Sequence, residues 1–537
     1  MPQIRIVWPV VGLVFAIAAP GPSASSSNGP VTLDSGQVSG LVGNDPAVLV
    51  YKGIPYAAPP VGDLRWRAPQ PVKTWDGVMA ADAFGPRCHG RSFGAPAATS
   101  VSEDCLNLNV WTPARVGGGK VPVFVWIHGG GFQGGSGSEP TFDGEALTTK
   151  GLIVVTFNYR TSVFGFLAHP ELTSESPYHA SGNYGLLDQI AALQWVQRNI
   201  AAFGGDPARV TIGGESAGAY SVSALTASPL ARGLFHQAIV ESGAYLSPKA
   251  DAMRSLRAAE QTGADFARTV GAVDLAALRL KSADEIMKAV TRMSDFFAFQ
   301  PGIDGRVLNE AVYSTYARGR QARIPLLIGS NTAEGAFLMP DQRPTAQEFE
   351  ARLEQRFGAH ASQVRELYPT DTPAALITSE VAFSGDLEFD YPMWKLATMQ
   401  RAAGRPVYYY LFGRTVPPAP GQLYKGIPLT EIGALHGAEV AYVFGTLDKV
   451  PPVPASADGR RRWQQTDREL SASMLGYWAN FVKTGDPNGP GLPAWPRYEA
   501  RAHDPLMHFD ERPEARPDGR TARMNVLDAV FQPDRRP

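Results

Sequence analysis

The chain has 537 residues, of which 44% are hydrophobic and 19% charged, and this ordinary globular balance provides enough apolar material for a large core. A formal net charge of −2 gives no reason to expect a nucleic acid as partner. No internal repeat or heptad run divides the sequence, so we expect one large domain, whose oligomeric state stays open.

The N-terminus is typical of a signal peptide. Arg5 supplies a short positive region, residues 6–19 are almost entirely apolar, and Ala16-Ile17-Ala18 offers a small-residue cleavage pattern. The apolar run is shorter than the roughly 20 residues that span a bilayer, so no stable membrane span is expected. We predict a signal peptide over residues 1–24, a folded domain over residues 25–537, and a secreted or periplasmic protein. The cleavage site stays open, and a short membrane anchor is the alternative.

The chain has two cysteines, Cys88 and Cys105. In an exported chain, an even number of cysteines indicates a disulfide, here one bond. Closing a loop of this length stabilises a fold by about 3 kcal/mol in the chain-entropy model. Two unpaired thiols are the alternative. A metal site needs more ligands than this pair offers, and no metal is expected.

The middle of the chain alternates strand-like and helix-like segments, which is typical of an α/β protein. Residues 121–127 (VPVFVWI) and 152–157 (LIVVTF) predict buried strands, because they are apolar on both faces. Between residues 184 and 200, apolar side chains recur every three or four positions, which predicts a helix with one buried stripe. A Gly-Gly-Asp-Pro break at residues 204–207 ends this helix, and residues 209–212 predict the next strand.

The second half of the chain predicts further strands at residues 235–240, 324–328 and 407–412. Between them, residues 250–300 and 341–400 look helical and irregular, and such insertions usually cover the mouth of a sheet. Residues 468–482 predict a C-terminal helix.

The decisive motif is Gly214-Glu215-Ser216-Ala217-Gly218, which fits the G-x-S-x-G nucleophile elbow. A predicted strand precedes it and a run of small, helix-compatible residues follows it, which is the context that the motif requires. The glycines allow backbone segments to come close at a sharp turn. Ser216 is therefore the predicted nucleophile, and Glu215 is expected to act as a hydrogen-bond partner beside it.

A serine hydroxyl needs a base, and the base needs an orienting acid; in this fold they follow the serine in the order acid, then histidine. His436 lies in the glycine-flanked loop GALHG after the strand at 407–412, which makes it the predicted base. The acid should follow a strand end, and Glu334 follows the strand at 324–328. Asp304 is the competing acid, with a structural turn as its expected role.

The acyl intermediate carries an oxyanion that needs backbone N–H donors. The run His128-Gly129-Gly130-Gly131 follows a predicted strand upstream of the elbow and matches the HGGG motif of lipases and esterases. We predict donors at Gly130, Gly131 and Ala217.

At this point the sequence resembles the type-B carboxylesterases, which include the cholinesterases. The resemblance rests on the segments FGGDPARVTIGGESAG (203–218), EDCLNLNVW (103–111), NYGLLDQ (183–189) and HGAE (436–439), and it runs from about residue 30 to 530. It implies an α/β-hydrolase fold with a mostly parallel central sheet, and a secreted, bacterial-type member of the family.

The resemblance also implies roles for single residues. The family's catalytic triad falls on Ser216, Glu334 and His436, and its first disulfide on Cys88 and Cys105. Ser242 falls on a position that hydrogen-bonds near the triad acid. Relatives build the acyl pocket near the segment that holds Phe296, Phe297 and Phe299; plain core aromatics are the equal alternative. Cholinesterases carry a choline-binding Trp in their first disulfide loop, whereas residues 89–104 contain none, so choline esters are not expected as the preferred substrate.

The sequence therefore predicts a serine carboxylic-ester hydrolase that acts on a small-molecule ester through an acyl-enzyme, without a cofactor. Two alternatives stay open. One is an amidase or carbamate hydrolase with the same triad, and the other is a non-catalytic binding module of the cholinesterase type.

Overall fold

The computed structural model describes residues 29–91, 100–115, 119–247, 253–340, 343–415, 423–450, 463–501 and 503–531. The predicted signal peptide, residues 1–24, lies outside them. Cys88 and Cys105 form a disulfide, as predicted. Within the described ranges, no helix is both long and apolar enough to cross a bilayer.

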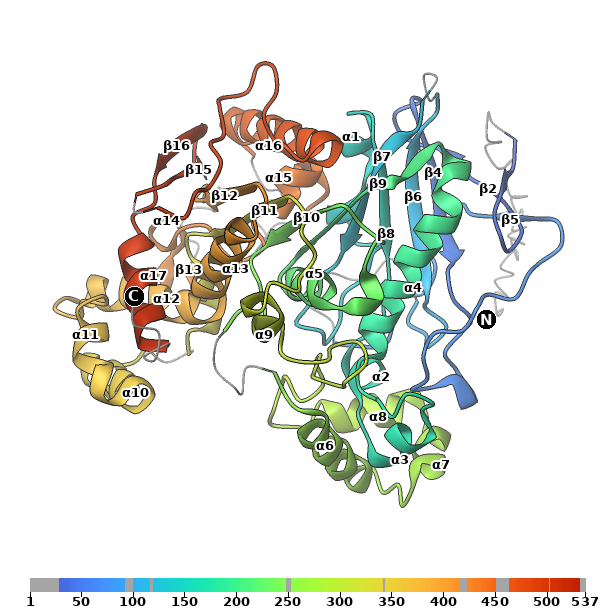
Figure 1. The fold of residues 1–537 in the computed structure, drawn as a ribbon, viewed down its shortest axis with the longest axis horizontal. Coiled ribbons are helices and arrows are strands. Elements are labelled where there is room, and N and C mark those ends of the chain that lie inside the picture. The colour runs from blue at the N-terminus through green and yellow to red at the C-terminus, as the bar shows by residue number, and fades with distance from the viewer. Residues whose placement is uncertain are drawn as a thin grey trace, which may run out of the picture.

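An 11-stranded, mostly parallel sheet runs through the molecule (Figure 1). Its parallel part consists, in spatial order, of β15 (Pro505–Phe509), β12 (Val407–Phe412), β11 (Leu326–Asn331), β10 (Gln237–Glu241), β9 (Gly205–Glu215), β7 (Val121–Ile127) and β8 (Ile153–Phe157). The antiparallel edges are β16 (Pro513–Pro517) on one side and β6 (Asn107–Pro113), β4 (Val48–Pro55) and β3 (Leu41–Val42) on the other. The predicted α/β-hydrolase fold is confirmed.

Two small sheets lie outside the large one. One consists of β1 (Val31–Thr32), β2 (Gln37–Ser39) and β5 (Val78–Ala80), and the other of β13 (Leu423–Tyr424) and β14 (Ile427–Pro428).

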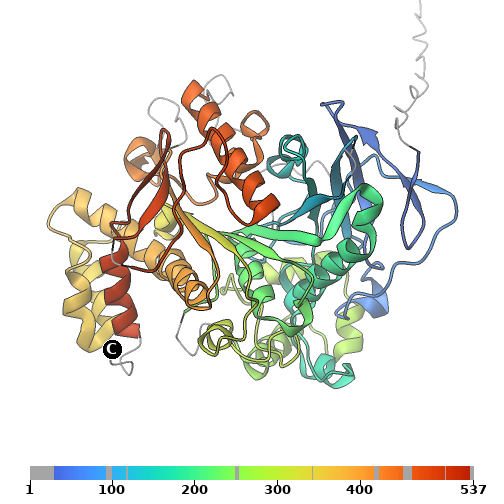
Figure 2. The same ribbon diagram turned by 45° about the horizontal axis from the view of Figure 1, so that its top comes forward.

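Helices cover both faces of the large sheet (Figure 2). On one face lie α4 (Tyr184–Asn199), α5 (Ala217–Ala227) and α13 (Tyr391–Ala402), and on the other α15 (Val440–Phe444) and α16 (Gln465–Thr484).

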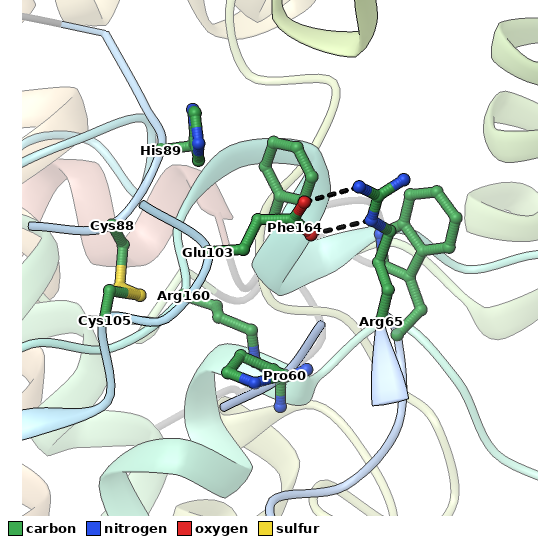
Figure 3. Close-up of a pocket in the computed structure, with 9 residues that line it drawn as sticks. Pro60, Arg65, Cys88, His89, Glu103, Cys105, Arg160 and Phe164 are labelled. Atoms are coloured by element: carbon green, nitrogen blue, oxygen red, sulfur yellow. Dashed lines mark hydrogen bonds and ion pairs between the residues drawn. A yellow bond between two sulfur atoms is a disulfide. The ribbon is translucent and has the colours of Figure 1, made fainter. Parts of the chain in front are cut away.

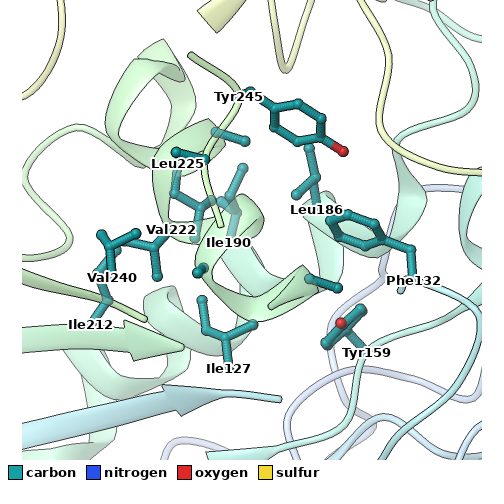
Figure 4. Packing of buried hydrophobic residues seen from close by; sticks show 14 of the residues in the cluster. Ile127, Phe132, Tyr159, Leu186, Ile190, Ile212, Val222, Leu225, Val240 and Tyr245 are labelled. Atoms are coloured by element: carbon teal, nitrogen blue, oxygen red, sulfur yellow. The ribbon is translucent and has the colours of Figure 1, made fainter. Parts of the chain in front are cut away.

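The side chains of β7 show why both faces are covered. Val123, Val125 and Ile127 belong to the core on the α4–α5 face, whereas Phe124 and Trp126 belong to the core on the α16 face. Successive strand residues point to opposite faces, so a strand apolar at every position needs a hydrophobic layer on each side. Figure 4 shows the first of these layers, where residues of the strands meet those of the helices: Ile127, Ile212, Val240, Leu186, Ile190, Val222 and Leu225.

The two long insertions form separate helical groups (Figure 1). The first contains α6 (Leu256–Thr269), α7 (Leu275–Leu280) and α8 (Ala283–Val290). The second contains α10 (Ala346–Phe357), α11 (Ala361–Arg365) and α12 (Pro373–Gly385), and a π-helical turn, η7 (Asp386–Asp390), joins α12 to α13. The remaining α-helices of the described residues are α1 (Glu145–Thr148), α2 (Ser162–Phe166), α3 (Pro170–Glu175), α9 (Val312–Ala317), α14 (Leu429–Ile432) and α17 (Thr521–Phe531).

Candidate active site

Two neighbouring strands, β9 and β10, end at one level, and β11 runs two residues further; the ends of these strands align the candidate site. In the parallel register, Glu215 of β9 pairs with Glu241 of β10, and Glu241 pairs with Gly329 of β11. The backbone continues this register beyond the strands, because the Ser216 N–H donates to the Glu241 carbonyl at 2.9 Å. Ligands of open α/β sheets bind beyond the carboxyl ends of the strands, which is where Ser216 lies.

Ser216 occupies the sharp turn between β9 and α5. Its backbone has φ 54° and ψ −123°, a conformation that L-residues rarely adopt. The flanking glycines make the turn possible: a Cβ on Gly218 would lie 2.0 Å from the carbonyl oxygen of Ile127, and one on Gly214 would lie 2.6 Å from the backbone of Gly218. The predicted elbow geometry is therefore present.

Glu334 and His436 are in direct contact. Glu334 begins the 3₁₀ helix η5 (Glu334–Leu338) after β11, and its Oε2 lies 2.5 Å from Nδ1 of His436. The other carboxylate oxygen accepts hydrogen bonds from the Ser242 hydroxyl at 2.5 Å and from the Asn331 N–H at 2.7 Å. With its side chain buried and both oxygens bonded, Glu334 is fixed against the imidazole. Ser242 thus makes the contact that the resemblance implied.

The far side of the His436 ring faces Glu215. Nε2 lies 3.1 Å from Oε1 of Glu215, without the geometry of a hydrogen bond. Glu215 in turn lies against the glycine loop, since a Cβ on Gly129 would be 2.7 Å from Glu215 Oε2 and 3.2 Å from Ser216 Cβ. Among the described residues, no hydrogen bond joins the Ser216 hydroxyl to the imidazole. The imidazole of His436 therefore contacts Glu334 through Nδ1, and its Nε2 lies next to Glu215, the residue before Ser216.

The carboxylates set the charge of the imidazole. Burial alone would lower the pKa of His436, but Glu215 and Glu334 outweigh it and raise this pKa to about 9. Burial raises the pKa of the Glu215 carboxyl, to about 7, against the opposite effect of His436. The two groups interact closely, so they titrate as a pair.

The glycine loop lies beside the elbow with free backbone donors. Gly130 and Gly131 have φ of +106° and +60°, and their N–H groups and that of Ala217 donate to no acceptor in the described part of the chain. A Cβ on Gly130 would lie 2.4 Å from the carbonyl oxygen of Gly134, so the loop is closely folded. The N–H groups of Gly130, Gly131 and Ala217 are thus available to an external anion.

The three candidate pocket phenylalanines separate into two groups. Phe296 and Phe297 lie beside the glycine loop, 3.5 Å from where a Cβ of Gly131 would be. Phe299 is buried and packs edge-on against Phe266 of α6 with ring centroids 5.2 Å apart. Phe299 is therefore a core aromatic, while Phe296 and Phe297 line the loop.

Asp304 has the expected turn role. Its Oδ1 accepts the backbone N–H groups of Arg306, Val307 and Leu308 at 2.9–3.1 Å. This leaves Glu334 as the carboxylate that contacts the imidazole through Nδ1.

Several neighbours of His436 were not found from the sequence. Phe337 of η5 and Phe389 of η7 lie against its ring, with centroids 4.8 and 4.7 Å away. Behind it, the buried Glu439 binds the Asn331 amide at 2.5 Å, and Glu241 accepts the Trp478 indole N–H at 2.7 Å. Glu439 belongs to the segment HGAE and Glu241 precedes Ser242, but no sequence pattern gave either residue a role.

A small cavity beside the disulfide lies outside this site (Figure 3). Its volume of about 10 Å³ is at the limit for one water molecule. The ion pair between Arg65 and Glu103 closes one side of it. The cavity is too small for an ester. In the described ranges, no group of three His, Cys, Asp or Glu side chains is placed to hold a metal ion.

The model of the Carboxylesterase family matches residues 27–527. The chain belongs to this family. It is an esterase-class enzyme by this membership and by its relatives, and the predicted resemblance is confirmed.

Bacterial and mammalian relatives cover most of this carboxylesterase. Fumonisin B1 esterase of Sphingopyxis macrogoltabida is 40% identical over 88% of this chain and 85% of its own. Para-nitrobenzyl esterase of Bacillus subtilis is 38% identical over 89% and 94%, and liver carboxylesterase 1 of Oryctolagus cuniculus is 34% identical over 86% of each chain. A solved structure of PNB esterase superposes with a TM-score of 0.77 at 36% identity, over 93% of this chain and 99% of the other.

Proposed function

We propose that this carboxylesterase hydrolyses small carboxylic esters through an acyl-enzyme on Ser216. His436 takes the proton of the Ser216 hydroxyl as the oxygen attacks the ester carbonyl, and then gives it to the leaving alcohol. Glu334 holds the imidazole through Nδ1 and stabilises its positive form. A water molecule, activated by His436, then releases the acid and restores Ser216.

The observation that carries this proposal is the Glu334–His436 contact at the nucleophile elbow. Catalytic hydrogen bonds are often long or poorly aligned in the free enzyme and tighten when substrate binds. In this structure Glu215 lies against Nε2 of His436, so we expect the Ser216–His436 hydrogen bond to form when substrate binds.

The glycine loop supplies the oxyanion hole in this mechanism. The N–H groups of Gly130, Gly131 and Ala217 receive the charge that develops on the carbonyl oxygen, and a single such donor contributes about 3 kcal/mol to the barrier reduction in related sites. The acyl chain lies toward Phe296 and Phe297, which line the loop beside Gly131.

The test compares Ser216→Ala with Ser473→Ala, a matched change at a half-buried serine of α16. With p-nitrophenyl butyrate, Ser216→Ala should lower kcat by at least about 10³-fold with an unchanged melting temperature, because the nucleophile is lost. A fluorophosphonate probe should label wild type and Ser473→Ala at the peptide that contains Ser216.

Full hydrolysis by Ser216→Ala would overturn the mechanism. Absence of both labelling and hydrolysis in wild type would favour the non-catalytic binding module. A panel of matched amides and carbamates decides between an esterase and the amidase or carbamate hydrolase.

A further inference from the structure

Glu388 places a carboxylate on the wall beside the candidate triad. It belongs to η7, the π-helical turn between α12 and α13, and its neighbour Phe389 packs on the His436 ring. Phe337 lies on the same ring and also contacts Phe389, with ring centroids 5.8 Å apart. π-helical turns are rare and often occur at functional sites. Here the turn packs Phe389 on the imidazole and holds Glu388 next to it in the chain.

Glu388 itself contacts α5, the helix that follows the nucleophile. The Tyr220 hydroxyl donates to Oε1 of Glu388 at 2.9 Å and to its backbone carbonyl at 2.7 Å. Tyr220 lies one turn after Ser216, since its N–H donates to the Ser216 carbonyl. Glu388 is therefore bonded to α5, while the adjoining Phe389 packs its turn on the His436 ring.

Three aromatic rings in contact, those of Tyr220, Tyr245 and Phe132, connect Glu388 to the glycine loop. The Tyr220 ring packs edge-on against Tyr245 at 4.8 Å, and Tyr245 stacks with Phe132, the residue after Gly131, at 6.5 Å. Figure 4 shows Tyr245 and Phe132 side by side. The buried Tyr245 hydroxyl has no hydrogen-bond partner among the described residues.

Glu388 itself keeps unused binding capacity. Its side chain is accessible, and within the described residues its Oε2 forms no hydrogen bond or ion pair. Burial raises the pKa of its carboxyl, while the Tyr220 hydroxyl and, more weakly, Arg356 and His436 lower it. An ammonium group that donates to this carboxylate would form a charge-assisted hydrogen bond, which is roughly twice as strong as a neutral one.

We infer that Glu388 is a specificity residue that selects esters whose alcohol part carries a protonated amine. The inference rests on the proposed function, because His436 must face the leaving alcohol in order to protonate it. The groups around the ring, Phe337, Phe389 and the adjoining Glu388, then surround that alcohol. The ammonium N–H donates to Glu388 Oε2, and the aromatic faces contact its carbon substituents.

The donor matters as much as the charge. A protonated tertiary amine carries an N–H, whereas a quaternary ammonium has none and gains only from charge and aromatic faces. The chain shows no Trp in its first disulfide loop, so preference for a protonated amine over a quaternary one is compatible with the absence of a choline platform.

The test uses two esters of the same shape, 2-(dimethylamino)ethyl butyrate and 3-methylbutyl butyrate, followed in a pH-stat at pH 7. The measured quantity is the ratio of their kcat/KM values. Glu388→Gln should lower this ratio about tenfold, the size expected for loss of a charge-assisted hydrogen bond. Glu366→Gln is the matched control, because Glu366 is exposed and makes no hydrogen bond or ion pair within the described residues. It should leave the ratio unchanged.

The outcomes separate this inference from the proposed function. Loss of hydrolysis of the neutral ester in Ser216→Ala reports on the triad, whereas the ratio reports on Glu388. An equal ratio in wild type and Glu388→Gln overturns the inference while the triad stands. The same ratio is measured for choline butyrate and 3,3-dimethylbutyl butyrate, a pair without an ammonium N–H. If Glu388→Gln lowers that ratio as much, a hydrogen bond from the N–H to Glu388 is overturned.

Discussion

Replacing Glu215 by Gln removes one of the two carboxylates beside His436 and keeps the size of the side chain. The pKa of His436 stands at about 9, against 6.5 for an unperturbed imidazole. Because burial lowers the pKa of His436, the neighbouring carboxylates must raise it by more than the difference between 6.5 and about 9. The charge of Glu215 is the largest single raising cause, and Glu334 acts through both its charge and its hydrogen bond. Its loss should lower the pKa by about one unit or more.

The sign of the effect follows from the role of the imidazole. His436 must be neutral to take the Ser216 proton, so kcat/KM falls as pH drops through the pKa of the ring. Wild type should be most active on the alkaline side, and Glu215→Gln should keep its activity to a lower pH. Burial raises the pKa of Glu215 to about 7, and Glu215 titrates together with His436. The acid limb of the wild-type pH profile therefore reports on both groups and should be broad.

The assay is kcat/KM for p-nitrophenyl butyrate from pH 5 to 9.5, read at the isosbestic wavelength of nitrophenol. Glu366→Gln, which removes the same charge from the surface, should leave the acid limb in place. An acid limb that stays put in Glu215→Gln, or moves to higher pH, would refute the electrostatic reasoning.

Two further predictions concern stability. Gly218→Ala should lower the free energy of unfolding by more than about 3 kcal/mol, because its Cβ would lie 2.0 Å from the Ile127 carbonyl oxygen; Gly519→Ala, with nothing within 4 Å, should stay within about 0.5 kcal/mol in urea denaturation. Equal stability of the two would count against the packing argument. Replacing Cys88 and Cys105 together by Ser should cost about 3 kcal/mol of unfolding free energy, measured the same way, and no loss would mean that the bond adds nothing.

The central strands could be predicted from the sequence because they are apolar on both faces. The strand at 407–412 matches β12 in full, and the helix at 184–200 matches α4 to within one residue. The antiparallel strands β4 and β6 were missed, as was β15 near the C-terminus. β9 begins at Gly205, inside the Gly-Gly-Asp-Pro segment that predicted a break, because pairing with β7 starts at Gly205 and Val121 and overrides the local turn signal.

The site divides in the same way. Ser216 and His436 were chosen from short glycine-containing segments, and Glu334 from its position after a predicted strand. The packing of Phe389 on His436, by contrast, joins segments 386–390 and 433–437 that no local pattern connects. Glu388 reaches Tyr220 across 168 positions of the chain. Such contacts form only when the insertion that contains α12 and η7 packs against the end of the sheet. The periodicity of the sequence therefore cannot predict them.

The π-helical turn η7 has a consequence for how the substrate range of this enzyme changes over evolution. A π turn holds one residue more than the α-helical turn it replaces, so deleting a single residue there would restore a continuous helix from α12 to α13. Residues on one side of the deletion would then rotate by about 100° relative to the other. Phe389 and Glu388 would leave the imidazole together, while the elbow, the glycine loop and the Glu334 contact kept their own supports. If the proposed roles hold, deleting one codon would change the alcohol specificity and leave the residues of the proposed triad in place.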